Sequence, residues 1–467
     1  MQALRALSIL SLSLASTVLF ACGDDPEPNN NEPTPCNTKL QTGCGAGLVC
    51  EEVEGGNPTC FAPVSFQGIV IDALSEKPIK DAYVVARDAN DAAVSRVAIS
   101  AADGSYSLSV PAKRDAEGKP VAAKLTLRAD ASGYQTFPLA PRIALPIDVN
   151  TATGTPLVVK NASTDIALIP LENAAGLGSI EGKVIVDSGL DLAPAGALVV
   201  AGGSTGIVDF DGNFRVFNVT VGAAVDVRGY AAGLQIDPAQ AAVNADKLTA
   251  GVELHVKSAA TAKVTGSVQI VNGNGFSTTS VVLALKDTFV ADAARGEVPK
   301  GLRVGNVTGA YEFVGVPDGD YVILAAFEND GLVRDPDLSI GGTTLLDVSI
   351  VGGQSVTKDG FKITGALTTV SPGKDAIEEV MGTPAFVWGD DSSEDHYEIR
   401  LFDAYGKKVW EDLAVPGVSG AKDVTVNYAG PALTPGMIYQ FRATSIGKNG
   451  GIPISQTEDL RGVFVQR

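Results

Sequence analysis

Ser65–Ala73 reads SFQGIVIDA and Ala102–Val110 reads ADGSYSLSV, and this two-part pattern decides the fold. Apolar and polar residues alternate along both pieces, which predicts half-buried β-strands. The pattern returns as GSIEGKVIVD with DFDGNFRVF from Gly178, and as AKVTGSVQIV with NVTGAYEFV from Ala262. Each copy has a glycine inside its first strand and an aromatic residue two positions after a later glycine. Three copies predict three β-sandwich modules in tandem and an all-β fold class.

The glycine and aromatic positions are Gly68 with Gly104 and Tyr106, Gly182 with Gly212 and Phe214, and Gly266 with Gly309 and Tyr311. In the first copy we expect Gly104 to take a positive φ in a hairpin. Tyr106 should face inward with Leu108 and Val110, because side chains on a strand alternate with a period of two. These three aromatics are expected to fill separate cores and to take no part in a reaction.

The first copy, FQGIVIDALSEKPIKDAYVVARD followed by ADGSYSLSVP, resembles the carboxypeptidase regulatory-like domain, a transthyretin-like β-sandwich. In the third copy, Gly315–Tyr321 (GVPDGDY) resembles a late turn of the same family. These motifs are structural, so the resemblance implies a fold and not an activity. The parent peptidases carry their zinc ligands on a separate α/β domain, which this sequence lacks. The only histidines, His255 and His396, lie far apart, so we expect no enzyme, no metal and no cofactor.

The C-terminal pattern, from TPAFVWGDD to LTPGMIYQFRATSIG, resembles a fibronectin type III domain. Trp388 would be its core tryptophan. The group Leu433-x-Pro435-Gly436-x-x-Tyr439 resembles a tyrosine corner, in which the phenol bonds back to the backbone.

Residues 1–21 have the length of a secretory signal peptide, and they end in Leu19-Phe20-Ala21-Cys22. That ending resembles the bacterial lipobox, which implies cleavage before Cys22 and a lipid on its thiol. The polar residues 22–35 are expected to form a disordered tether. We therefore expect a lipid anchor in the bacterial cell envelope, at the outer membrane. The formal net charge of −19 makes nucleic acid a poor partner.

Four further cysteines, Cys36, Cys44, Cys50 and Cys60, fall within 25 residues of an exported chain. The even count in an oxidising compartment predicts two disulfides, with three pairings possible. Zinc is the alternative, but the closely paired cysteines that a tetrahedral zinc site uses are absent.

The expected domain organisation is a signal peptide at 1–21, a tether at 22–35, a cysteine-rich module at 36–62, sandwiches at 63–172, 176–258 and 261–352, and a fibronectin type III-like sandwich at 360–467.

Several short patterns have a structural and a chemical interpretation. Asp209–Gly212 (DFDG) is interpreted as a hairpin turn rather than a calcium loop, and Asp390–Asp395 as a solvated loop. Gly202–Gly206 (GGSTG) spells a nucleophile elbow, but a strand follows it where a helix is required. Trp410 and Tyr405 are weak candidates for sugar-stacking platforms.

The sequence therefore predicts a non-enzymatic, lipid-anchored envelope protein with a structural, adhesive or partner-binding role. The alternative is a carbohydrate-binding component of polysaccharide uptake or cell-wall attachment. Either role leaves a protein or a glycan as the partner.

Overall fold

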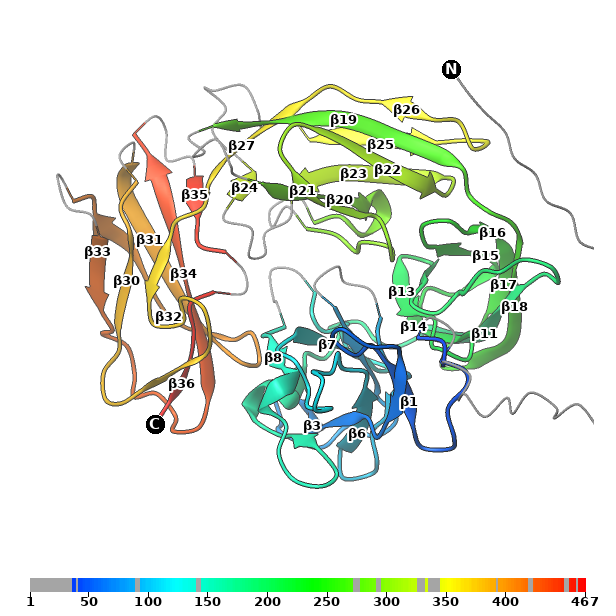
Figure 1. Cartoon of the computed structure of the whole chain (residues 1–467), viewed down its shortest axis with the longest axis horizontal. Helices are drawn as coiled ribbons and strands as arrows, with labels where there is room; N and C mark the ends of the chain where they lie inside the picture. Colours follow the sequence, from blue (N-terminus) through cyan, green and yellow to red (C-terminus); the bar gives the residue numbers. More distant parts are fainter. Residues whose placement is uncertain are drawn as a thin grey trace, which may run out of the picture. The chain divides into compact units, whose positions relative to one another are not determined.

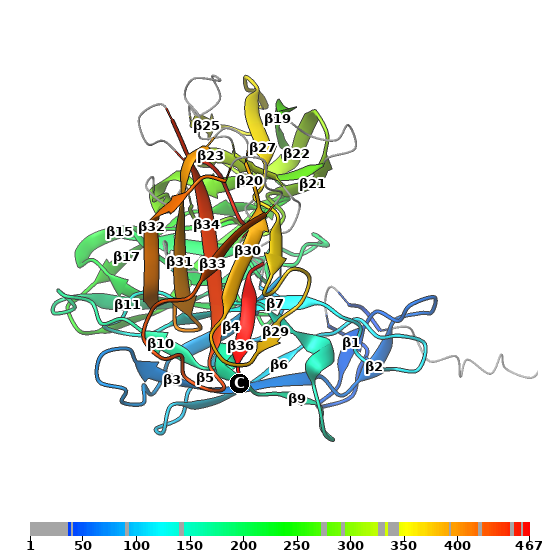
Figure 2. The same ribbon diagram turned by 90° about the vertical axis from the view of Figure 1, so that its left-hand side faces the viewer.

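The computed structural model describes residues 36–467 apart from 39–40, 89–92, 140–143, 272–277, 291–294, 326–331, 335–344, 392–393, 419–422, 449–452 and 459–460. The predicted all-β fold class is confirmed: short strands build a two-stranded cysteine-rich module and then four pairs of sheets (Figures 1 and 2). The helical segments of the described residues are 3₁₀ turns. Nothing in the described part of the chain forms a helix long and apolar enough to cross a bilayer.

The first sandwich follows strands β1 (Val49–Glu51) and β2 (Thr59–Phe61) of the cysteine-rich module. Its elements are β3 (Val64–Asp72), β4 (Tyr83–Arg87), β5 (Ala98–Ile99), β6 (Ser105–Val110), β7 (Lys124–Asp130), β8 (Ile147–Asp148), η1 (Val149–Thr151), β9 (Val158–Val159), η2 (Ala162–Thr164) and β10 (Ile166–Leu168). One sheet has the order β10-β3-β6, with β9 also on β3, and the other has the order β5-β4-β7-β8. The first strand, β3, pairs antiparallel with β6 and parallel with the last strand, β10.

The second and third sandwiches repeat this topology. The second contains β11 (Gly178–Val186), β12 (Leu198–Ala201), β13 (Ser204–Ile207), β14 (Asn213–Val219), β15 (Gly222–Tyr230), β16 (Gln235–Asp237), β17 (Ala239–Val243) and β18 (Leu248–Ser258). The third contains β19 (Ala262–Val271), β20 (Thr279–Leu285), η3 (Lys286–Thr288), β21 (Arg303–Val307), β22 (Ala310–Val316), β23 (Gly319–Ala325), β24 (Leu332–Arg334), β25 (Leu346–Ile350), β26 (Val356–Thr357) and β27 (Phe361–Gly365). In each, the first strand again pairs antiparallel with the fourth and parallel with the last.

The repeated glycine and the repeated aromatic residue form a cross-strand pair in every copy. The registers are Gly68 opposite Tyr106, Gly182 opposite Phe214, and Gly266 opposite Tyr311. A Cβ atom on Gly182 would lie 2.5 Å from the Phe214 ring, and one on Gly266 would lie 2.3 Å from the Tyr311 hydroxyl. Each ring therefore occupies the space that a side chain on the glycine would need, which explains why the two residues recur together.

The three aromatics are buried, as predicted, and belong to three different cores. In β6 the alternation is complete, because Tyr106, Leu108 and Val110 are buried and the serines between them are exposed. Gly104 has the predicted positive φ of 76°, but its turn is not the predicted hairpin, because β5 pairs with β4 and β6 pairs with β3 of the other sheet. Gly212 has a φ of 82° in the corresponding turn of the second copy. The third copy differs at this point, since Gly309 is not left-handed.

The fourth sandwich has another topology. Its strands are β28 (Thr369–Ser371), β29 (Glu378–Val380), β30 (Ala385–Gly389), β31 (Glu394–Asp403), β32 (Lys408–Pro416), β33 (Asp423–Asn427), β34 (Ile438–Gly447), β35 (Pro453–Gln456) and β36 (Val463–Gln466). A sheet of order β28-β30-β33 packs on one of order β29-β36-β34-β31-β32, with β35 on β34. Trp388 is fully buried in this core, as predicted. The predicted tyrosine corner is also present, because the backbone N–H of Thr434 donates to the Tyr439 hydroxyl over 2.9 Å.

Candidate functional site: a groove between the first two sandwiches

The four cysteines of the cysteine-rich module form two disulfides, which confirms the prediction and resolves the pairing as Cys36–Cys50 and Cys44–Cys60. The Sγ atoms of Cys36, Cys44 and Cys50 lie within 4.8 Å of one another, a distance that metal ligands also have. Here both disulfides account for that proximity, and a disulfide sulfur is not the thiolate that zinc requires. Cys22, the predicted lipid attachment residue, lies outside the described residues.

The cysteine-rich module is attached to the first sandwich by a buried ion pair. Glu51 of β1 contacts the guanidinium of Arg114, and both side chains are almost fully buried. Glu51 also accepts a 2.8 Å hydrogen bond from the backbone N–H of Ala112, and Arg114 donates to the carbonyl of Ala62. The Arg114 guanidinium lies 4.9 Å from the centre of the Phe61 ring. These contacts fix the disulfide module on its neighbour.

The two candidate sugar platforms lie in the fourth sandwich. The indole of Trp410 stacks on Phe386 with ring centres 6.0 Å apart and meets the edge of Tyr428 at 5.3 Å. One face of this indole is thus committed to the core. Tyr405 is half-buried, and burial raises the pKa of its phenol, with the nearby carboxylate of Asp165 adding to the rise. Neither Trp410 nor Tyr405 lines either of the two pockets described below.

Asp209–Gly212 forms a turn, but the prediction of a hairpin is wrong, because β13 pairs with β12 and β14 pairs with β11, so the turn connects the two sheets of the second sandwich. Asp209 Oδ1 accepts from the backbone N–H groups of Asp211 and Asn213, at 2.9 and 2.8 Å. Gly202–Gly206, by contrast, contains a hairpin turn: Gly202 and Gly203 are left-handed and connect β12 directly to its antiparallel partner β13. In the acidic loop, the Tyr397 hydroxyl donates to Asp390 over 2.8 Å. The carboxylates of Asp209 and Asp390 therefore accept hydrogen bonds from groups nearby in the chain.

A buried ion cluster connects the first three sandwiches. Arg128 of β7 is completely buried, and its guanidinium donates to Asp130 of the same strand over 2.9 Å. It donates to Glu297 of the third sandwich over 2.7 Å and to the Thr205 hydroxyl of the second over 2.8 Å. Arg87, also buried, lies 3.6 Å from Glu297. Burial alone would lower the pKa of Arg128, but the carboxylates of Asp130 and Glu297 raise it above its ordinary value.

This cluster was not predicted. The alternation of β7 places Leu125, Leu127 and Ala129 in the core of the first sandwich, so Arg128 and Asp130 should face solvent. The other two sandwiches cover that face instead. A buried charge pair whose partners come from different modules fixes those modules relative to one another, because separating them would leave each charge unpaired.

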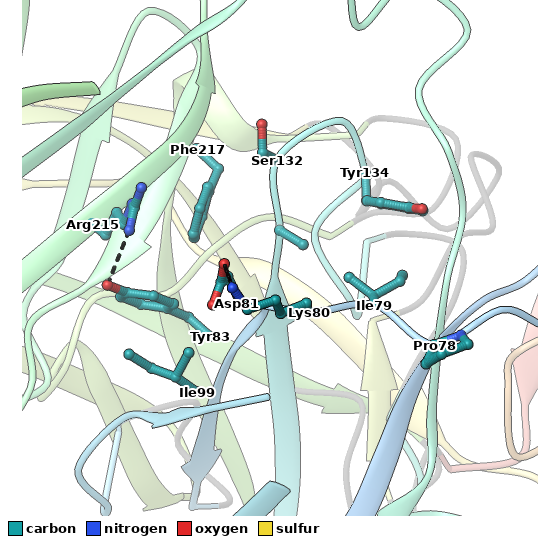
Figure 3. A pocket seen from close by; sticks show the side chains of 11 residues that line it. Pro78, Ile79, Lys80, Asp81, Tyr83, Ile99, Ser132, Tyr134, Arg215 and Phe217 are labelled. Carbon is teal, nitrogen blue, oxygen red and sulfur yellow. Dashed lines mark hydrogen bonds and ion pairs between the residues drawn. The ribbon is translucent and has the colours of Figure 1, made fainter. Parts of the chain in front are cut away.

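A groove lies where the first sandwich meets the second. One pocket of about 490 Å³ and a neighbouring one of about 430 Å³ share Tyr83, Ile99 and Arg215 among their lining residues. Figure 3 shows Arg215, Tyr83 and Phe217 grouped on one side of the larger pocket, with Pro78 and Tyr134 on the other. An exposed ion pair, Arg96 with Asp211 at 2.6 Å, joins the same two modules.

Arg215 is held against two aromatic rings. Its guanidinium carbon lies 5.3 Å from the centre of the Tyr83 ring and 4.9 Å from that of Phe217. The Tyr83 and Phe217 rings meet edge to face at 5.2 Å. Nη1 donates to the Tyr83 hydroxyl over 3.2 Å and lies 3.7 Å from the half-exposed carboxylate of Glu181. Cation–π contact and ring packing thus orient this side chain before any ligand arrives.

The sequence held one signal for this groove. In β14 the inward residues are Phe214 and Val216, so Arg215 and Phe217 belong to the outward face. Yet Phe217 is only 5% exposed. An aromatic side chain on the face that alternation assigns to solvent indicates a covered surface. The partner strand, β4 with Tyr83, is far away in the sequence and gives no local signal.

No protein-family model and no curated protein matches this chain. Among solved structures, the chain is similar to the Bacillus anthracis TIE protein, with 11% identity over 83% of this chain and 68% of that one and a TM-score of 0.17. It is also similar to BcpA, the major pilin subunit of Bacillus cereus, with 11% identity over 65% and 99% and a TM-score of 0.16. A DUF3823 family protein from Parabacteroides merdae shares 11% identity over 44% and 98%, with a TM-score of 0.19. All these scores lie below 0.5, so we base no functional argument on the likeness.

Proposed function

We propose that this chain is a non-enzymatic protein of the bacterial cell envelope, anchored by a lipid on Cys22, that acts as a structural or adhesive scaffold and binds a partner. The observation that carries the proposal is the buried cluster around Arg128, which ties three sandwiches together through side chains of each. A scaffold needs modules whose relative positions are fixed, and the cluster supplies that. The repeated aromatic residues support it as well, since each is used in packing.

The finer family assignments belong to the same proposal. Three sandwiches that each pair their first strand in parallel with their last support tandem carboxypeptidase regulatory-like domains. The three-stranded sheet packed on a larger one, with Trp388 in the core and Thr434 bonded to Tyr439, supports a fibronectin type III-like fold for the sandwich of β28 to β36. The third sandwich includes β27 (Phe361–Gly365), so it extends past its predicted end at residue 352 and takes the first residues of the predicted 360–467 domain. The other domain boundaries stay predictions from the sequence.

Membrane fractionation of cells that express the full chain or its Cys22→Ser variant tests the anchor. We expect the native protein in the outer-membrane fraction, labelled by a fatty-acid analogue, and the variant unlabelled in the soluble fraction, because acyl chains contribute about 0.8 kcal/mol for each buried CH₂. A Ser13→Ala variant, changed inside the same leader but outside the lipobox, is the matched control. Continued membrane retention of the unlabelled Cys22→Ser variant would contradict the lipid anchor.

A glycan partner stays a prediction. A glycan array probed with the full chain and with Trp410→Ala separates the two classes of partner. Binding that the Trp410→Ala change abolishes would favour the carbohydrate role, and an array without any bound glycan leaves a protein partner.

A further inference from the structure

The two pockets that flank Arg215 form one extended groove with walls from two modules. Tyr83 and Ile99 come from the first sandwich and Arg215 from the second, and all three residues line both pockets. The groove is therefore longer than either pocket alone. Such a shape suits an elongated ligand better than a compact one.

The guanidinium of Arg215 has unused hydrogen-bonding capacity. A guanidinium carries five N–H donors, and a carboxylate can accept two of them side by side. In the described part of the chain, Arg215 donates one hydrogen bond, to the neutral hydroxyl of Tyr83, and its Nε has no partner. Its side chain is only 23% exposed. The Glu181 carboxylate lies 3.7 Å from Nη1, which is too far for a hydrogen bond, so the remaining N–H donors of this partly buried charge are open to an anionic acceptor.

The carboxylates around Arg215 discriminate against an anion with two charges. Glu181, Asp209 and Glu253 line the smaller pocket, where Lys183 is the only other cation among the described lining residues. These carboxylates would repel a phosphate with two charges more strongly than a carboxylate with one. Ile99, 53% exposed, offers an apolar contact in the same groove. The ligand chemistry that fits is a carboxylate next to an apolar group.

Strand β5, which contributes Ile99 to the groove, has β4 as its ladder partner among the described residues. It is the edge strand of its sheet, and Ile99 stands opposite Tyr83 of β4. The N–H of the following residue, Ser100, bonds to the carbonyl of Ala82. Because bonded and non-bonded pairs alternate in an antiparallel ladder, the N–H and C=O of Ile99 point away from β4. An extended peptide can add to such an edge.

We propose that this groove binds an extended peptide of a partner protein, whose carboxylate accepts two hydrogen bonds from Arg215 while an apolar neighbour contacts Ile99. This inference rests on the proposed partner-binding function and names the chemistry of the partner. The carboxylate can belong to an acidic side chain or to the C-terminus of the peptide, which are the same group for Arg215.

Fluorescence polarisation with the purified full chain tests the proposal. The probes are a library of labelled eight-residue peptides of Val and Thr with one central Glu, the same peptides with Gln, and both sets with free or amidated C-termini. We expect the carboxylate peptides to bind about tenfold or more tightly than their amide counterparts, and Arg215→Gln to abolish this difference. Arg228→Gln, which changes an exposed arginine of β15 outside the groove, should keep it.

Ile99→Glu covers the case in which Arg215→Gln does not fold, because it leaves Arg215 in place and supplies a competing carboxylate within the groove. We expect it to weaken peptide binding by a similar factor. Binding that is the same for every carboxylate peptide and its amide counterpart, at both the central and the C-terminal position, would overturn the proposal. So would equal effects of Arg215→Gln and Arg228→Gln, or a preference for oligoglucuronate over every peptide. Those outcomes leave the Cys22 fractionation result untouched, so failure of this inference is distinct from failure of the anchor.

Discussion

Glu297→Gln should destabilise the first three sandwiches together. Among the described residues, the cluster brings two cations, Arg87 and Arg128, together with two carboxylates, Asp130 and Glu297, and the exposed fractions of these side chains run from 0 to 15%. The substitution keeps the size of the side chain but removes the Glu297 carboxylate from both guanidinium groups. Removing one partner of a buried ion pair costs about 3–5 kcal/mol. At about 2–4 °C for each kcal/mol, the melting temperature should fall by roughly 6–20 °C.

The two tryptophans make the measurement selective. Trp388 and Trp410 both lie in the fourth sandwich, so tryptophan fluorescence follows that module, whereas far-UV circular dichroism follows all strands. We expect the circular dichroism transition to shift and the fluorescence transition to change far less. The matched control is Arg96→Gln, which breaks the exposed pair with Asp211 between the first two sandwiches and should cost below about 1 kcal/mol. If Glu297→Gln shifts the transition no more than Arg96→Gln, the cluster does not hold the modules together.

Three further predictions concern single sites. Gly182→Ala should lower the free energy of unfolding of the second sandwich by about 1–3 kcal/mol, because the new Cβ would lie 2.1 Å from the Val252 carbonyl oxygen. Chemical denaturation measures this change. The control is Gly309→Ala, where no atom lies within 4 Å and the backbone is not left-handed, and it should leave the denaturation midpoint nearly unchanged. Tyr439→Phe should lower the stability of the fourth sandwich by about 1–3 kcal/mol, read by tryptophan fluorescence, since the N–H of Thr434 loses its acceptor; an unchanged midpoint would contradict a stabilising corner. Glu394→Gln should stabilise the same module at pH 7 and not at pH 4. Burial raises the pKa of Glu394 above its ordinary value, and the nearby carboxylates of Asp390 and Asp391 add to the rise. The folded state therefore favours the protonated form, and its stability falls as the pH rises from the ordinary pKa to the raised one. Melting temperatures of the native protein and the variant that depend equally on pH would refute this.

The sequence alone predicted which residues form the core of a single sandwich. Alternation placed Tyr106 in a core, and the fibronectin type III resemblance placed Trp388 in one. The even cysteine count predicted two disulfides, although not which cysteines pair. The contacts between modules were not predicted. Alternation shows which face of a strand points into its own core, but it does not show whether the opposite face is covered by solvent or by a neighbouring module. Arg128 and Phe217 are outward residues by this rule, and both are buried by partners distant in the chain. The groove with Arg215 was missed for the same reason.

The parallel pairing of first and last strands determines how each of the first three sandwiches would respond to a pulling force. In the second sandwich, β11 and β18 run side by side in the same direction. A pull on the start of β11 and the end of β18 therefore slides the two strands along each other, and their hydrogen bonds bear the load at once rather than opening one by one. A chain loaded between an anchored end and a captured ligand would resist extension through this shear geometry, at each module, without any added covalent cross-link.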